Sequence, residues 1–216
     1  MTNAIFSVGK NIKIGGGTTI LNLPPIKTCT NCSTCASSCY ANFRYQYPSV
    51  KKRWDNNLIE TKKSSFVEKA TIELKYLGSN IVRYHESGDF YNDNYINKCY
   101  KLAKACPSVM FFGYTKNKNA LKLNKLSNVN VIYSFIDSEI GLIRNYGNKD
   151  YCNYLHEHYN TFICPHDDSW KKQGKKCMVD CKESLTCNNV AFVQHGRKAK
   201  SDPYSKETLA KLKGLK

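Results

Sequence analysis

The amino-acid sequence predicts an α/β fold, built on a curved parallel sheet or a partial β/α barrel with cysteine-rich metal-binding loops. β-prone runs alternate with helical patterns at roughly 25-residue spacing, which is typical of βαβ units. Polar residues follow several of these runs, where α/β proteins place their chemistry. Eight of the 11 cysteines fall in two segments, residues 29–39 and 164–187.

The β-prone run at 18–23 ends at Pro24-Pro25 and leads into the first cysteine segment. Apolar residues then recur with helical spacing over 58–77, and Gly78 is a suitable helix stop. Further on, we expect strands at 80–85, 109–114 and 129–135, separated by helices at 91–105 and 119–126. The second half is less regular, with expected strands at 161–163 and 190–195 and a basic helix at 205–215.

Length and charge restrict the class of protein. A chain of 216 residues suits one domain, here an iron–sulfur α/β domain over residues 1–196 followed by a basic C-terminal helix or tail over 197–216. The net charge of +16, from 33 basic and 17 acidic residues, favours nucleic acid as a partner. An anionic partner protein is the alternative. No stretch approaches the roughly 20 apolar residues of a membrane span, so we expect a cytoplasmic protein without membrane contact.

The cysteines of residues 29–39 have the spacing C-x2-C-x2-C-x3-C. Zinc sites usually take two ligand pairs from separate knuckles, so one short loop around a single ion would be strained. A cubane cluster spreads its corners more widely, and ferredoxins use the same spacing. We therefore predict a 4Fe-4S cluster here, with a four-cysteine zinc loop as the alternative and with three or four ligands in use. The predicted ligands are Cys29, Cys32, Cys35 and Cys39.

A second, looser cysteine set has 12, 3 and 5 residues between its members. Neighbouring lysines would help to keep the thiols deprotonated. We predict a second 4Fe-4S cluster or a structural zinc ion, and four buried reduced cysteines are the alternative. The predicted ligands are Cys164, Cys177, Cys181 and Cys187. The scattered Cys99, Cys106 and Cys152 are expected to be small buried side chains.

A polar group follows the expected strand at 80–85. His85, Glu86, Ser87 and Asp89 offer a base, two acids and a hydroxyl around the flexible Gly88. We predict that these four residues bind an amino or hydroxyl function of a small cofactor. The alternative is a hydrogen-bonded loop in which Ser87 and Asp89 cap a helix.

Aromatic and basic residues interleave between residues 40 and 54. Stacking faces beside phosphate-binding charges suit single-stranded nucleic acid. The alternative is an aromatic core stripe on a helix with a solvated basic side. The residues predicted to contact nucleic acid are Arg44, Lys51, Lys52 and Arg53, together with Lys171 and Lys172 of the second cysteine segment.

Several of these motifs resemble a phage protein family, gene product 88. The resemblance rests on residues 23–29, on the cysteines that lead to Cys39-Tyr40-Ala41, and on residues 83–90 and 112–116. It spans about residues 11–195 and implies a phage or mobile-element origin, hence the host cytoplasm. The order of motifs is also similar, more distantly, to radical S-adenosylmethionine enzymes of the spore photoproduct lyase kind. That resemblance implies that Ser87-Gly88-Asp89 lies where those enzymes bind S-adenosylmethionine, although their cysteine loop reads C-x3-C-x2-C.

The motifs and the resemblance together predict a phage-encoded iron–sulfur protein that acts on or binds nucleic acid. If it is an enzyme, the resemblance implies modification by radical chemistry with S-adenosylmethionine. The alternative is a non-enzymatic, metal-stabilised protein that binds nucleic acid or a host protein, as a replication accessory or as a host-takeover or anti-defence factor. The sequence assigns no catalytic residue.

Overall fold

The computed structural model describes residues 4–8, 18–30, 36, 39–138, 141–144, 146–147, 149–164, 173, 186, 189–193 and 203–214. The chain divides into two compact units, residues 1–131 and 132–216. The predicted domain boundary at residues 196 and 197 lies outside the described residues. Among the helices described, none is long and apolar enough to cross a membrane.

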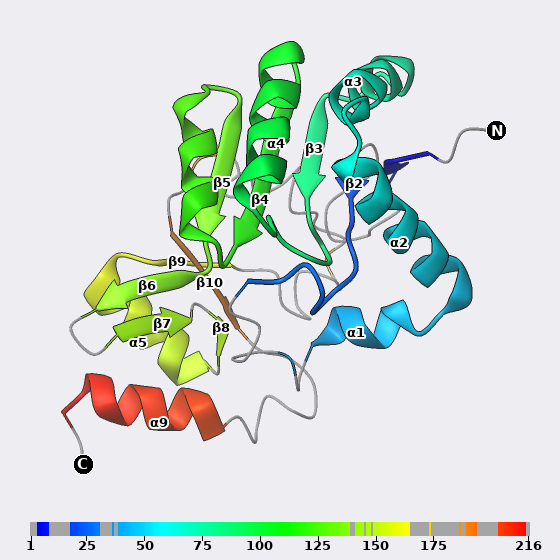
Figure 1. Ribbon diagram of the computed structural model, residues 1–216. Coiled ribbons are helices and arrows are strands. Elements are labelled where there is room, and N and C mark those ends of the chain that lie inside the picture. The colour runs from blue at the N-terminus through cyan, green and yellow to red at the C-terminus, as the bar shows by residue number, and fades with distance from the viewer. Residues whose placement is uncertain are drawn as a thin grey trace. The chain divides into compact units, whose positions relative to one another are not determined.

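A five-stranded sheet organises the first unit, in the order β1-β2-β3-β4-β5. Its strands are β1 (Ser7–Val8), β2 (Thr19–Leu21), β3 (Ile81–Tyr84), β4 (Met110–Thr115) and β5 (Val129–Tyr133). β2, β3 and β4 are parallel, and only β1 pairs antiparallel, with β2. Figure 1 shows β5 running in the same direction as β4. The mostly parallel α/β sheet is therefore confirmed, while the partial barrel is not found, since the described strands form an open sheet with β1 and β5 at its edges.

Helices connect the strands and supply about half of the buried residues of the core. Those among the described residues are α1 (Tyr40–Tyr45), α2 (Pro48–Lys62), α3 (Phe66–Tyr76), α4 (Asp93–Ala105) and the 3-10 helix η3 (Lys118–Lys125). The helix predicted at 58–77 is in fact parts of two helices, because Lys63 is extended (φ −70°, ψ 149°) and ends α2. The helix predicted at 119–126 is the 3-10 helix, which begins where the side chain of Asn117 accepts a bond from the main-chain N–H of Asn119.

The two faces of the sheet differ in chemistry. Side chains alternate along β3, so Val82 and Tyr84 face the helices and join their hydrophobic cluster. Tyr84 stacks on Phe111 there, with 5.4 Å between ring centroids. Arg83 points to the opposite face, which we call the Arg83 face. The strand register sets Arg83 between Ile20 of β2 and Phe112 of β4.

The second unit contains smaller sheets. Parallel strands β8 (Tyr146–Gly147), β10 (Val190–Val193) and β9 (Phe162–Ile163) form one, and β6 (Phe135–Ser138) pairs antiparallel with β7 (Gly141–Arg144). The helices described in this unit are α5 (Lys149–Tyr159) and α9 (Pro203–Leu212). The strands expected at 161–163 and 190–195 are confirmed over 162–163 and 190–193, and the terminal helix is confirmed at 203–212. The strand expected at 129–135 is interrupted at Ser134, which separates β5 from β6.

Candidate functional site

The strands β2, β3 and β4 end at the same edge of the sheet (Figure 1), and the chain after β3 binds the chain after β2 there. We call residues 85–89 the strand-end loop. The main-chain N–H of Leu23 donates to the carbonyl of Ser87 at 2.9 Å, and the Ser87 hydroxyl donates to the carbonyl of Leu23 at 2.9 Å. The N–H of Ser87 donates to Oδ1 of Asn22 at 3.0 Å. Ser87 therefore fixes the loop to the segment that leads into the first cysteine.

Asp89 connects the strand-end loop to β4. Its Oδ1 accepts from the Thr115 hydroxyl at 2.5 Å and from the N–H of Phe90 at 2.7 Å, and its Oδ2 accepts from the N–H of Lys116 at 2.8 Å. Burial raises the pKa of Asp89, and these three bonds oppose the rise without cancelling it. The contacts of Ser87 and Asp89 are those of a hydrogen-bonded loop, and their contact with a cofactor stays a prediction.

His85 is buried at the start of this loop and has a left-handed backbone, with φ of 58°. Its Nε2 lies 2.9 Å from the hydroxyl of Tyr95, and the ring packs edge-on against Phe90 with centroids 4.6 Å apart. Burial lowers the pKa of His85 to about 3, so the imidazole is neutral at physiological pH. Its Nδ1 is closed off from water and has no hydrogen-bond partner among the described residues. This nitrogen can accept from, or donate to, a ligand.

Both ends of the first cysteine segment adjoin this edge. Before Cys29, the Thr28 hydroxyl donates to the carbonyl of Pro24 at 2.6 Å, which closes a tight turn. After Cys39, α1 begins, and the hydroxyl of its first residue, Tyr40, donates to the carbonyl of Glu86 in the strand-end loop. The segment therefore starts and ends beside the loop that contains His85.

The metal predictions fall only partly on described residues. Cys29, Cys39 and Cys164 are described and are half-buried. Cys32, Cys35, Cys177, Cys181, Cys187, Lys171 and Lys172 lie outside the described residues. Within the described part of the chain, His, Cys, Asp and Glu form no cluster of three or more that could hold a metal ion. Two thiols at the ends of one short segment nevertheless suit the donor chemistry of a cluster.

The isolated cysteines behave as small apolar side chains, as expected. Cys99 and Cys152 are 0% exposed and Cys106 is 5% exposed. Burial raises the pKa of Cys99 to about 12, so its thiol is inert at neutral pH.

The basic aromatic stretch divides into an internal and an external part. Trp54 is 7% exposed and stacks on Tyr45, whose hydroxyl donates to Asp55. Lys51 also pairs with Asp55, at 2.5 Å, and Arg53 donates to the carbonyl of Phe6. These contacts agree with the alternative prediction for this stretch, an aromatic core stripe on a helix.

The external part consists of Tyr40, Phe43 and Tyr47, which are 64%, 63% and 54% exposed. Phe43 and Tyr47 contact each other edge to face, with centroids 6.1 Å apart. Arg44 on α1 and Lys52 on α2 are also exposed and form no ion pair within the described residues. We call these five residues the α1 patch. Of the four predicted contacts in this stretch, only Lys51 is paired with a carboxylate within the described residues, and Arg44 and Lys52 are the two whose side chains bond to no described group.

Arg83 was not singled out from the sequence, although it interrupts the apolar run of β3. Its Nη1 lies 3.2 Å from Oε1 of Glu86, and the two side chains are 19% and 15% exposed. Its Nε is closed off from water and has no hydrogen-bond partner among the described residues. The sequence did contain a signal that could have identified Arg83, namely a charged residue at the centre of a buried strand.

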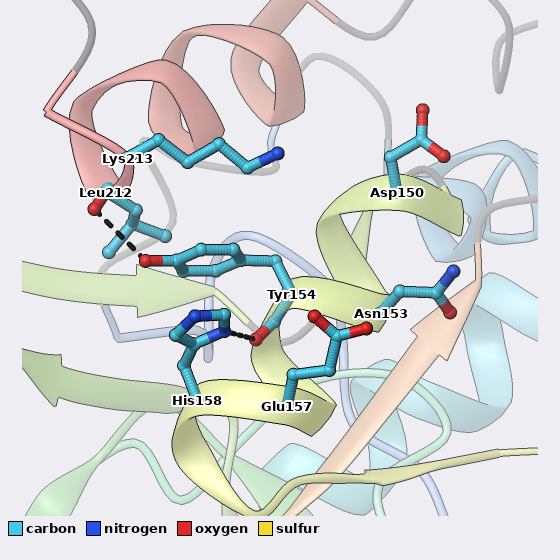
Figure 2. A pocket seen from close by; sticks show the side chains of 7 residues that line it. All are labelled: Asp150, Asn153, Tyr154, Glu157, His158, Leu212 and Lys213. Atoms are coloured by element: carbon cyan, nitrogen blue, oxygen red, sulfur yellow. Dashed lines mark hydrogen bonds between the residues drawn. The ribbon is translucent and has the colours of Figure 1, made fainter.

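The second unit contains a separate cavity of about 660 Å³ between α5 and α9. Figure 2 shows Tyr154 and His158 side by side on α5, with ring centroids 4.0 Å apart, and the Tyr154 hydroxyl donating to the carbonyl of Leu212. The carboxylates of Asp150 and Glu157 line the same cavity. None of the predicted site residues that the structure describes borders it.

A protein-family sequence profile described as Gene product 88 matches residues 5–211, and so covers the sheet, the strand-end loop and both cysteine segments. No curated protein matches the chain, and no solved structure does.

Proposed function

Because the chain belongs to the Gene product 88 family of phage proteins, we propose that it is a phage-encoded iron–sulfur protein that acts on nucleic acid in the host cytoplasm. The observation that carries this proposal is the bond from the Tyr40 hydroxyl to the carbonyl of Glu86. It ties the end of the cysteine segment to the loop that contains His85. A redox centre and a ligand-binding nitrogen would therefore lie at one edge of the sheet.

Cys29, Cys32, Cys35 and Cys39 would hold the cluster, and a bound cluster supplies one-electron chemistry. The residues of the strand-end loop would then position a small cofactor, which is S-adenosylmethionine if the chemistry is of the radical type. The neutral imidazole of His85 can offer one hydrogen bond without bringing a charge. At the second cysteine set we propose a second cluster or a zinc ion, held by Cys164, Cys177, Cys181 and Cys187.

Replacing either described ligand of the first set should reduce the iron content. We expect Cys29→Ser and Cys39→Ser, purified without oxygen, to lose the iron of the first cluster, because a hydroxyl is a poor substitute for a thiolate ligand. The loss is measured as iron and acid-labile sulfide per chain, together with the visible absorbance of the protein.

Cys106→Ala is the matched control, since Cys106 is buried in the core of the same unit and belongs to neither set. It should keep the iron of the wild type. If Cys29→Ser and Cys39→Ser also keep all of it, the first segment is not the ligand set.

The α1 patch supports the nucleic-acid part of the proposal. Exposed aromatic rings can stack on bases, and unpaired cations beside them can contact phosphates. The three exposed rings occupy one short helix and its C-terminal turn, and the first of them, Tyr40, contacts the strand-end loop. A strand bound on this patch would therefore pass beside the edge of the sheet where the chemistry is proposed.

Phe43→Ala should weaken the binding of a single-stranded oligonucleotide by about tenfold, because stacking on one ring contributes about 1–3 kcal/mol. Arg44→Gln and Lys52→Gln should each lower the slope of log affinity against log salt by about 0.7. Fluorescence anisotropy over a salt series measures both effects.

Tyr76→Ala is the control for the ring, since Tyr76 is an 89% exposed aromatic residue on α3, outside the patch. Its affinity should equal that of the wild type. Equal affinities for Phe43→Ala and the wild type would exclude the patch as the binding surface.

A second candidate is a non-enzymatic, metal-stabilised protein that binds nucleic acid or a host protein. The hydrogen bonds of Ser87 and Asp89 favour it, because they engage both side chains within the protein. Cleavage of S-adenosylmethionine by the reduced protein would support the enzyme, and iron-loaded protein without cleavage would support the binding protein.

A further inference from the structure

Three buried side-chain atoms have no hydrogen-bond partner among the described residues: Thr30 Oγ1, Arg83 Nε and His85 Nδ1. Folded proteins pair nearly all buried polar atoms, so each exception calls for a reason. Arg83 and His85 are two residues apart on β3 and the strand-end loop, and Thr30 follows Cys29. The exceptions thus occur on the segments that meet at the edge described above.

The guanidinium of Arg83 is held in one orientation. Its Nη1 faces Oε1 of Glu86 at 3.2 Å, and its neighbours across the sheet, Ile20 and Phe112, are 3% and 2% exposed. Neither neighbour offers a side-chain acceptor. The edge formed by Nε and Nη2 presents two parallel N–H donors, an arrangement that fits two oxygens of a carboxylate or phosphate.

The residue that pairs with Arg83 is also fixed from the cysteine segment. The Tyr40 hydroxyl donates to the main-chain carbonyl of Glu86, whose side chain lies 3.2 Å from Nη1 of Arg83. The helix that follows Cys39 is therefore attached to the residue that orients the guanidinium.

We propose that Arg83 binds an oxyanion, the phosphate or carboxylate group of a small ligand, through its Nε–Nη2 edge on the Arg83 face. Glu86 holds the guanidinium in place and weakens its attraction for anions. No cysteine takes part, so the site is independent of the proposed cluster.

Binding of inorganic phosphate and of acetate to the full-length chain, followed by isothermal titration calorimetry, tests this site. We expect the wild type to bind one of them, with an affinity on the order of millimolar for a single arginine contact. Tighter phosphate binding indicates a phosphorylated ligand, and tighter acetate binding indicates a carboxylic acid. Arg83→Gln should weaken that binding about tenfold, whereas Lys101→Gln, which removes an exposed charge on α4, should change it less than about twofold.

Glu86→Gln should change the affinity for the anion in the opposite direction. It keeps the shape of the side chain and removes the competing carboxylate, so anion binding should become tighter, which a loss of folding cannot imitate. An Arg83→Gln variant that binds as the wild type does, or a wild type that binds neither anion, overturns the proposal. The iron content of the same samples reports separately on the proposed cluster.

Discussion

Gly88→Ala is expected to lower the free energy of unfolding by about 4 kcal/mol, because it combines backbone strain with overpacking. Gly88 has a φ of 82°, a backbone conformation that residues other than glycine rarely adopt. A Cβ atom there would lie 2.5 Å from Oγ1 of Thr28 and 2.7 Å from Cβ of Leu23. Thr28 is itself bonded to Pro24, so the turn before Cys29 cannot move aside without losing that bond.

Gly78→Ala separates the two contributions. Gly78 has a φ of 59°, but no atom lies within 4 Å of the position its Cβ would take. It should therefore lose only the strain, about 1 kcal/mol. Denaturant unfolding of both variants measures the difference. Equal losses would show that the turn before Cys29 does not press on the strand-end loop.

Acid is expected to destabilise the protein through His85. The folded-state pKa is about 3 against an ordinary value of 6.5, so the unfolded chain binds a proton between these two values while the folded chain does not. Stability is therefore full above about pH 6.5 and falls as the pH drops toward 3, by about 1.4 kcal/mol per pH unit and about 5 kcal/mol in all. Unfolding free energies measured across this window test the slope.

His85→Asn removes the titrating imidazole, and asparagine tolerates the positive φ of this position. Its stability should fall less steeply between pH 6.5 and 3 than that of the wild type. His158→Asn, which replaces an exposed histidine of α5, should keep the wild-type slope. Burial raises the pKa of Asp89, so its protonation in the folded state stabilises the protein as the pH falls and opposes the effect of His85. Both variants retain Asp89, so the difference between their slopes and that of the wild type reports on the histidine. Parallel slopes for His85→Asn and the wild type would contradict a buried neutral imidazole.

The regular elements could be predicted from the sequence because their signals are local. The runs that became β3 and β4 are rich in residues that favour strands, and Gly78 follows α3 as a helix stop. The meeting of the strand-end loop with the chain before Cys29 also follows from parallel topology alone.

The roles of individual side chains depended on contacts far apart in the sequence. Nothing near Tyr40 indicates that its hydroxyl reaches Glu86, 46 residues away. Trp54 and Tyr45 have the composition of a stacking surface, yet they pack on each other and leave Phe43 and Tyr47 exposed. The side chains of Ser87 and Asp89 bind residues 64 and 26 positions away, which no local pattern could reveal.

The metal content of the wild-type chain, purified from start to finish without oxygen, tests the central claim most directly. The account predicts a brown protein with about four iron and four sulfide per occupied cysteine set. A colourless protein that contains zinc and no iron would contradict it.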